Sequence, residues 1–217
     1  MTPRATVLRW CFNALYGRLA FAHEVTGWIA FGAAWDARRG LILDRTRTSR
    51  GVVLDIGCGD GRLLERYECS RVRCLGVEPS PGMARRANAR GAFVVRARAE
   101  QLPARSSSVA TIVSTYPGPW IMSAETHTEI ARVAAVSCDV WLLLGGTYER
   151  GPGAGARRLV TRMAYGRQTA EPPDMAIPGF IGSWEIVSDA WGSALVWHGR
   201  RWDQRPADGR TESSSSS

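Results

Sequence analysis

The chain contains no lysine. All 28 basic residues among its 217 are arginine, and against 20 acidic residues they give a net charge of +8. The arginines are scattered and form only short pairs, such as Arg38-Arg39 and Arg157-Arg158. Because there is neither a basic block nor a basic stretch interleaved with aromatic residues, the sequence predicts no nucleic-acid partner. The charge would still suit an anionic membrane surface or an anionic substrate.

Cysteine and histidine are also scarce, with five and three residues. No two cysteines form a C-x-x-C pair, and the histidines add no ligand spacing. The sequence therefore predicts no metal site and no disulfide framework. This use of cysteine is typical of a reducing compartment, so we expect a cytoplasmic protein.

Long uncharged runs are missing from the first 45 residues. The longest there, Val25 to Trp35, has 11 residues, which is too short to span a bilayer. The segment has helical spacing and many aromatic residues, and we expect residues 1–45 to form a helical cap over the site. It could instead simply pack on the sheet, or make peripheral contact with a membrane surface. We expect one domain over residues 46–203 and a disordered tail over residues 204–217.

The most informative stretch runs from Gly51 to Ser80. An apolar run of strand type ends at Ile56, and Gly-Cys-Gly-Asp-Gly follows at residues 57–61. A helix-like segment and a second strand-like run come next, and this run ends at Glu78. Bare backbone in such a turn lets N–H groups and a helix N-terminus face a ligand, and a carboxylate after the second strand can accept hydrogen bonds from ribose hydroxyls. The pattern predicts a nucleoside-binding α/β unit.

The position of the third glycine distinguishes the motifs for two kinds of cofactor. A dinucleotide fingerprint would place it at position 62, which is arginine here, whereas this chain has Gly61. Asp55 also lies two residues before the first glycine. The spacing therefore argues against NAD.

The stretch Asp55-Ile56-Gly57-Cys58-Gly59-Asp60-Gly61 resembles the first motif of the class I S-adenosylmethionine-dependent methyltransferases. Residues 78–83 resemble the second acidic motif of that family, and residues 99–103 resemble its adenine loop. The resemblance implies S-adenosylmethionine as cofactor and a doubly wound, Rossmann-like α/β fold. Its seven-stranded sheet would be mostly parallel, with an antiparallel C-terminal hairpin strand. The cofactor-binding residues that it implies are Asp55, Gly57, Cys58, Gly59, Gly61, Glu78, Pro79, Met83, Ala99, Glu100 and Thr115.

Two positions depart from the family pattern. Many members have aspartate at the position of Arg98, where it receives the adenine amino group, and arginine cannot accept a hydrogen bond. The family's usual Phe-Asp pair is Val109-Ala110 in this chain. These departures leave a second hypothesis open, namely a non-catalytic protein of the same fold that senses the cofactor or binds a partner.

The loop at residues 116–120, Tyr-Pro-Gly-Pro-Trp, leaves the C-terminal end of a predicted central strand. Its π faces could stabilise a sulfonium or hold a flat acceptor, although they could also be structural. We expect Tyr116 to be the catalytic residue if the acceptor requires a base. The predicted substrate pocket consists of Tyr16, His23, Trp28, Tyr116 and Trp120. The predicted reaction is in-line methyl transfer to a small apolar or aromatic acceptor, which could be lipid-like, and the oligomeric state stays open.

The remaining elements follow from periodicity and turn residues. We expect helices over residues 81–90, 123–136 and 156–165, with Ser80 and Ser123 as the N-caps of the first two. The expected strands cover residues 93–95, 109–115 and 140–144, followed by a hairpin over residues 184–190 and 194–200.

Overall fold

The computed structural model describes residues 20–69, 72–148, 150–151, 153–165 and 172–202. Residues 20–30, 32, 69 and 160–165 are described by their backbone alone. Tyr16 and the predicted tail lie outside the described residues. The side chains of His23 and Trp28 do too, so their place in the predicted pocket stays a prediction.

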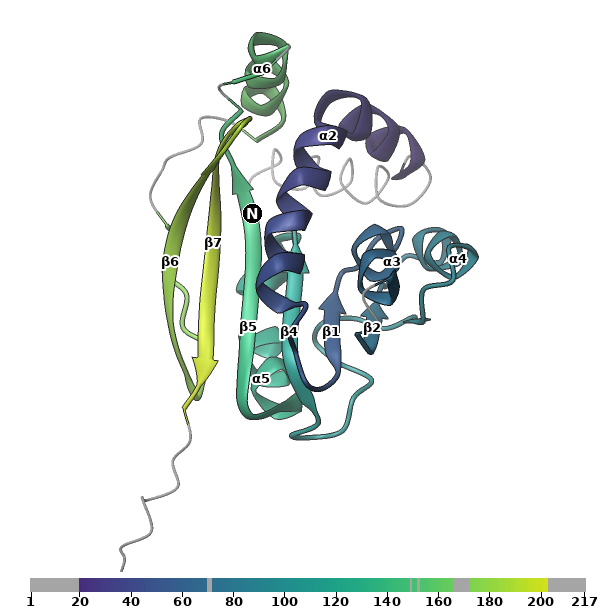
Figure 1. The fold of residues 1–217 in the computed structure, drawn as a ribbon, viewed down its shortest axis with the longest axis vertical. Coiled ribbons are helices and arrows are strands. Elements are labelled where there is room, and N and C mark those ends of the chain that lie inside the picture. The colour runs from purple at the N-terminus through teal and green to yellow at the C-terminus, as the bar shows by residue number, and fades with distance from the viewer. Residues whose placement is uncertain (1–19, 70–71, 149, 152, 166–171, 203–217) are drawn as a thin grey trace, which may run out of the picture.

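A single seven-stranded sheet organises the domain, in the order β3-β2-β1-β4-β5-β7-β6 (Figure 1). β7 runs antiparallel to β5 and β6, while the other pairs are parallel, which confirms the predicted fold. The strands are β1 (Val53–Ile56), β2 (Cys74–Val77), β3 (Val94–Val95), β4 (Val109–Thr115), β5 (Ala134–Gly146), β6 (Phe180–Asp189) and β7 (Gly192–Arg201).

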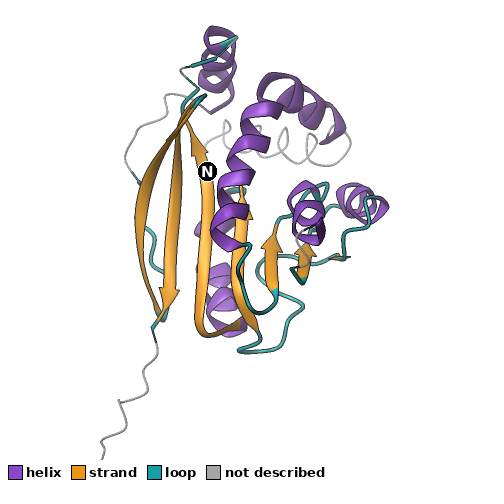
Figure 2. Ribbon diagram, in the orientation of Figure 1, coloured by secondary structure: helices purple, strands orange, loops and turns teal. Residues whose placement is uncertain are grey.

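Helices cover both faces of this sheet. Figure 2 shows the long helix α2 passing in front of the central strands and α5 lying behind them. No helix in the described part of the chain has the length and apolar character needed to cross a membrane. The helices are α2 (Ala20–Thr46), α3 (Arg62–Cys69), α4 (Pro81–Ala89), the 3-10 helix η1 (Pro119–Met122), α5 (Ala124–Val133) and α6 (Ala154–Tyr165).

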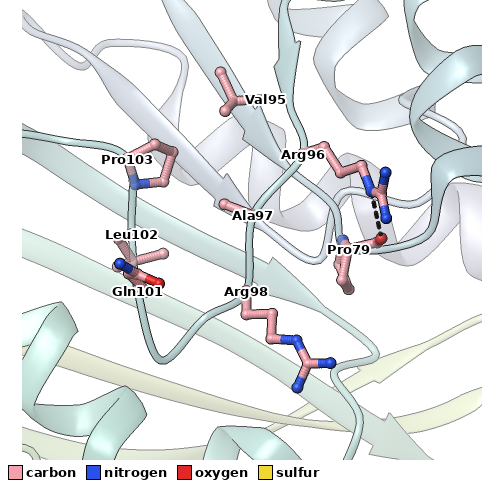
Figure 3. A pocket seen from close by; sticks show the side chains of 8 residues that line it. All are labelled: Pro79, Val95, Arg96, Ala97, Arg98, Gln101, Leu102 and Pro103. Atoms are coloured by element: carbon pink, nitrogen blue, oxygen red, sulfur yellow. Dashed lines mark hydrogen bonds between the residues drawn. The ribbon is translucent and has the colours of Figure 1, made fainter.

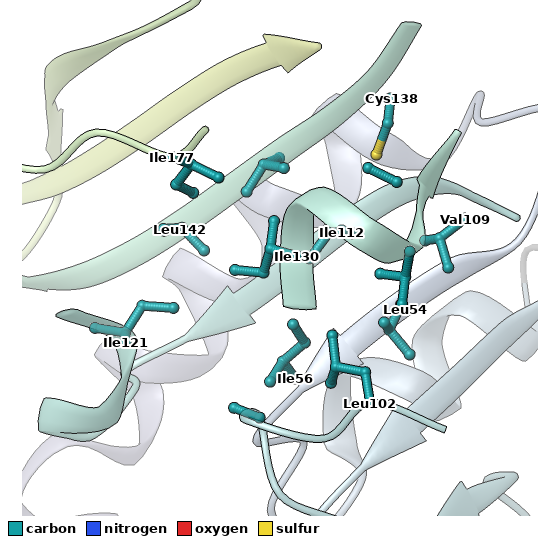
Figure 4. Packing of buried hydrophobic residues seen from close by; sticks show 14 of the residues in the cluster. Leu54, Ile56, Leu102, Val109, Ile112, Ile121, Ile130, Cys138, Leu142 and Ile177 are labelled. Carbon is teal, nitrogen blue, oxygen red and sulfur yellow. The ribbon is translucent and has the colours of Figure 1, made fainter. Parts of the chain in front are cut away.

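The central strands are buried on both faces, as expected for parallel strands between helices. Leu54 and Ile56 point toward α5 and pack with Ile112 and Ile130 in the larger core (Figure 4). Val53 precedes Leu54 in β1, so its side chain points to the opposite face of the sheet, where it packs with residues of α2 and α3. This arrangement brings the C-terminal ends of β1, β2 and β4 to one edge of the sheet.

Two local predictions needed correction. The helix expected to reach residue 136 ends at Val133, because Ala134 already pairs with Val109 and opens a strand that begins six residues earlier than predicted. Ser80 occupies the N-cap position of α4, but its side chain makes no capping hydrogen bond. The prediction that Ser123 is the N-cap of α5 is confirmed, since its Oγ accepts from the N–H of Thr126 at 3.2 Å.

Candidate functional site

The glycine turn follows β1 directly and has left-handed backbone at all three glycines. The φ angles are 73° at Gly57, 57° at Gly59 and 81° at Gly61, a region that favours glycine. A side-chain carbon at Gly61 would lie 2.8 Å from the Cβ of Ala87, so this glycine lets α3 and α4 approach closely. A carbon at Gly59 would meet nothing within 4 Å. The turn is therefore open to a ligand at its middle glycine.

Glu78 lies at the end of β2 and points toward this turn. Its Oε2 accepts from the N–H of Gly59 at 3.0 Å, and its Oε1 accepts from the N–H of Ser80 at 2.8 Å. Burial raises the pKa of this carboxyl above its ordinary value, and the two N–H donors oppose that rise. The predicted ribose-binding carboxylate is thus at the turn, held by backbone donors.

Asp55 lies at the end of the neighbouring strand and is also buried. Its Oδ1 has no hydrogen-bond partner within the described residues. Burial raises the pKa of this carboxyl to about 7, with Glu78 adding to the rise and Arg39 on α2 opposing it. An unpartnered buried carboxyl oxygen has a cost of about 1–3 kcal/mol, which a bound donor would relieve.

A hollow of about 720 Å³ lies between Pro79 and the loop after β3, where the adenine loop was predicted (Figure 3). Within this loop Ala99 is buried, whereas Glu100 is exposed and does not line the hollow. Of the predicted cofactor residues, Pro79 takes part in its wall. The lining consists of Pro79, Val95, Arg96, Ala97, Arg98, Gln101, Leu102 and Pro103.

Two residues of α5 hold this loop in place, and the sequence analysis missed both. The N–H of Leu102 donates to Oε2 of Glu129 at 2.8 Å, and Nη2 of Arg132 donates to the carbonyl of Leu102 at 2.9 Å. Glu129 and Arg132 also pair with each other at 2.6 Å. Their i, i+3 spacing was visible in the sequence, but nothing there identified the loop that they bind.

The cap helix is joined to the sheet by a buried arginine that the sequence analysis also missed. Arg38 is fully buried and its Nε donates to Asp189 at 2.6 Å, while its Nη2 donates to the carbonyl of Thr147 at 2.8 Å. The guanidinium also lies 4.6 Å from the centroid of the Tyr148 ring. These contacts join the C-terminal half of α2 to the end of β6 and to the segment after β5. Ile42 in the same half packs with Val53 and Val113 of the sheet, and the role of the segment as a cap over the site stays a prediction.

Aromatic rings fill the space between α2 and the strand ends. Trp35 packs against Tyr116 with ring centroids 5.3 Å apart, and its Nε1 donates to the hydroxyl of Tyr148 at 3.0 Å. The ring of Phe31 lies 4.7 Å from that of Tyr148. These rings form an aromatic wall at the C-terminal end of β4, which consists of Phe31, Trp35, Tyr116 and Tyr148.

Tyr116 itself is strained and half-buried, with its hydroxyl oxygen buried. Its φ is 55°, unusual for an aromatic residue, and its hydroxyl has no hydrogen-bond partner among the described residues. Burial raises its pKa well above the ordinary value, with the positive charges of Arg38 and Arg39 opposing the rise. The hydroxyl therefore stays protonated near neutral pH, which suits a hydrogen-bond donor better than the base that we predicted.

Trp120, the other described member of the predicted pocket, packs in a different cluster from Tyr116. Its indole lies against the glycine turn, since a side-chain carbon at Gly57 would be 2.9 Å from its Cζ2. The protein's own side chain thus covers the first glycine, while the middle glycine stays open. The burial of Cys58 raises its thiol pKa, which agrees with a small packing residue in the turn.

The fold is a Rossmann-like α/β domain, and its glycine turn is open at Gly59 with the Glu78 carboxylate beside it. Residues 53–136 match the family model described as a methyltransferase domain. Over this segment the chain is similar to the S-adenosylmethionine-dependent methyltransferases. This confirms the resemblance found in the sequence.

Curated relatives agree over part of the chain. An uncharacterized methyltransferase from Mycobacterium avium (strain 104) is 35% identical over 111 residues, which is 46% of this chain and 44% of that protein. A second, from Mycolicibacterium paratuberculosis, is 35% identical over 46% of this chain and 43% of its own length. The match thus spans less than half the length of either relative.

Solved structures are similar in fold over a larger share of this chain than the curated relatives cover. A methyltransferase from Thermotoga maritima has a TM-score of 0.59 at 18% identity, over 84% of this chain and 96% of that one. A second, from Methanococcus maripaludis, has a TM-score of 0.60 at 16% identity, over 88% and 95%. Geranyl diphosphate C-methyltransferase from Streptomyces coelicolor A3(2), in complex with geranyl diphosphate and S-adenosylhomocysteine, has a TM-score of 0.52 at 12% identity, over 77% and 78%.

Proposed function

We propose that this chain binds S-adenosylmethionine at the glycine turn and catalyses transfer of its methyl group to a small acceptor. The observation that carries the proposal is the turn left open at Gly59 with the Glu78 carboxylate held beside it. When bound, the cofactor supplies an activated methyl group on a sulfonium. The protein's part is then to bind, orient and exclude water, and such positioning can supply several kcal/mol, up to about 7–11.

The described residues divide this work among them. Glu78 would accept hydrogen bonds from the two ribose hydroxyls, for which its present N–H partners leave further lone pairs. The unpartnered oxygen of Asp55 would accept from an ammonium or N–H donor of the ligand. The hollow beside Pro79 would take the adenine base. These roles use the strand ends of β1 and β2 and the loop after β3.

The aromatic wall supports an apolar or aromatic acceptor. Trp35 and Tyr116 present rings at the end of β4, the central strand next to the turn. The structure that contains geranyl diphosphate shares this fold, which is in keeping with an acceptor that has an apolar hydrocarbon part. The Tyr116 hydroxyl would serve as a donor that orients the acceptor, because burial keeps it protonated.

Titration calorimetry with S-adenosylhomocysteine tests the cofactor site. Glu78→Gln keeps the shape but loses the charge, and we expect about 10-fold or greater loss of affinity. Glu125→Gln, which removes an exposed carboxylate on α5, should bind like wild type. No binding by wild type, or equal affinity of the two variants, would contradict the proposal.

A second candidate function is cofactor sensing without catalysis, favoured by Arg98 at the base hollow. Methyl-labelled S-adenosylmethionine, incubated with a panel of apolar and aromatic hydroxyl, amine and thiol compounds, separates the two. Label transfer that Glu78→Gln reduces supports the enzyme. Binding without transfer to any compound favours the sensor.

A further inference from the structure

The hollow beside Pro79 has an unusual set of polar groups. Arg96, Arg98 and Gln101 supply its polar side chains, and no carboxylate takes part in the lining. The rest of the lining is apolar side chains and backbone (Figure 3). Such a hollow can hold a flat base by its faces, since both apolar side chains and a guanidinium plane stack on aromatic rings.

We propose that this hollow takes the purine of the cofactor without requiring its 6-amino group, and that Arg98 makes the site tolerant of a 6-oxo purine. The inference rests on the proposed function, because it assumes that the nucleoside binds here. It makes Arg98 a specificity-determining residue of the cofactor site.

The two purines differ in the hydrogen bonds that their 6-position can make. A 6-amino group donates hydrogen bonds, whereas a 6-oxo group accepts them. Arginine has donors only, so Arg98 can serve a 6-oxo group and cannot serve a 6-amino group. Gln101 carries both a carbonyl and an amide, so its side chain can turn to serve either base.

Carboxylates near the hollow are engaged elsewhere or point away from it. Both carboxylate oxygens of Glu129 already accept hydrogen bonds. Oε1 accepts from Arg132, and Oε2 accepts from Arg132 and from the N–H of Leu102. Glu78 is directed at Gly59 and Ser80. Glu100 is exposed and does not line the hollow. Within the described residues, then, none of these groups is placed to select a 6-amino group.

The backbone of the loop is held in place. Both backbone groups of Leu102 are bound by α5, and the N–H of Gln101 donates to the carbonyl of Arg98 at 3.1 Å. Ala99 and Leu102 of the loop are buried. A base in the hollow would therefore meet the side chains of Arg98 and Gln101 on a fixed backbone.

The test compares S-adenosylhomocysteine with S-inosylhomocysteine, its 6-oxo analogue, by titration calorimetry on the full chain. For wild type we expect the two dissociation constants to agree within about 3-fold, because no carboxylate side chain in the lining selects the amino form. Arg98→Asp supplies the missing acceptor, and we expect it to favour the adenosyl ligand by about 10-fold or more. Arg105→Asp makes the same charge change at an exposed position outside the lining, and should leave the ratio as in wild type.

The ratio of the two constants removes effects common to both ligands, such as partial unfolding or a changed net charge. A wild-type preference above about 30-fold for the adenosyl ligand would overturn the proposal, as would an unchanged ratio in Arg98→Asp. Failure of the proposed function looks different, because neither ligand would then bind wild type, and the inference would fall with it. Glu78→Gln should weaken both ligands equally, which locates the effect at the base.

Discussion

Gly57 and Gly59 share left-handed backbone but have different surroundings, and this difference allows a sharp test of the turn. The φ angles are 73° and 57°. A side-chain carbon at Gly59 would meet nothing within 4 Å, whereas one at Gly57 would lie 2.9 Å from Cζ2 of Trp120. The two alanine substitutions therefore share a backbone cost, and only one of them adds a steric cost.

The expected magnitudes follow from this geometry. An alanine forced into left-handed backbone costs about 1–2 kcal/mol, which is the whole expected loss for Gly59→Ala. Gly57→Ala must also displace the indole of Trp120, and overpacking of this kind costs about 1–3 kcal/mol more. We expect total losses in the free energy of unfolding of about 1–2 kcal/mol for Gly59→Ala and about 2–5 kcal/mol for Gly57→Ala.

Urea denaturation of the two variants, each alone and combined with Trp120→Leu, forms a double-mutant cycle. In the Trp120→Leu background the excess loss at Gly57 should disappear, while the loss at Gly59 should persist. Equal losses at the two glycines, or an excess at Gly57 that survives without the indole, would refute the reasoning. Affinity for S-adenosylhomocysteine gives an independent readout, because the new methyl at Gly59 would project into the open crevice and should weaken binding.

Three further predictions concern charged groups. Asp189→Ala leaves Arg38 buried without its carboxylate partner, so the free energy of unfolding should fall by about 3–5 kcal/mol in urea titrations. The pKa of Asp55 is about 7 against an ordinary 3.8, so the folded state binds more protons than the unfolded state between these values. Stability should then fall as pH rises from about 4 to about 7, and this dependence should be weaker in Asp55→Asn. Glu129→Leu removes the acceptor of the Leu102 N–H and loosens the loop, and S-adenosylhomocysteine should bind about 3- to 10-fold more weakly by calorimetry, with adenosine affected in the same proportion.

Matched controls accompany these changes. Asp44→Ala removes an exposed partner of Arg47 at 4.0 Å and should change stability by less than about 0.5 kcal/mol, so a similar loss from Asp189→Ala would count against a buried ion pair. Urea midpoints of wild type and Asp55→Asn at about pH 5 and about pH 8 show the predicted difference in slope, and parallel slopes would contradict it. Wild-type affinity in Glu129→Leu would mean that the hydrogen bond to Leu102 does not position the base.

The sequence was most informative where neighbouring residues determine the structure. Left-handed turns select glycine, so residues 57–61 identified the turn. A short apolar run identified β1, and alternation of apolar residues identified the final hairpin. In each of these cases the signal lies within a few residues of the feature it predicts. The seven-stranded arrangement, by contrast, was implied by the resemblance to the methyltransferase family.

The contacts that shape the site could not be predicted in this way, because they join distant segments. Arg38 and Asp189 are 151 residues apart, and Leu102 and Glu129 are 27 apart. In the sequence Arg38 was one of many scattered arginines, with nothing to show that it would be buried. The side to which Trp120 turns was equally hidden, since the loop that carries it has no periodicity.

The two carboxylates at the strand ends show how surroundings assign different tasks to similar groups. Glu78 receives two backbone N–H donors, which favour its charged form and suit it to neutral hydroxyls. Asp55 has an oxygen without a partner and a pKa of about 7, so near neutral pH it is only partly ionised. A cation bound against Asp55 would lower that pKa and complete its ionisation. Asp55 is therefore a group through which a positively charged ligand would gain affinity over a neutral one.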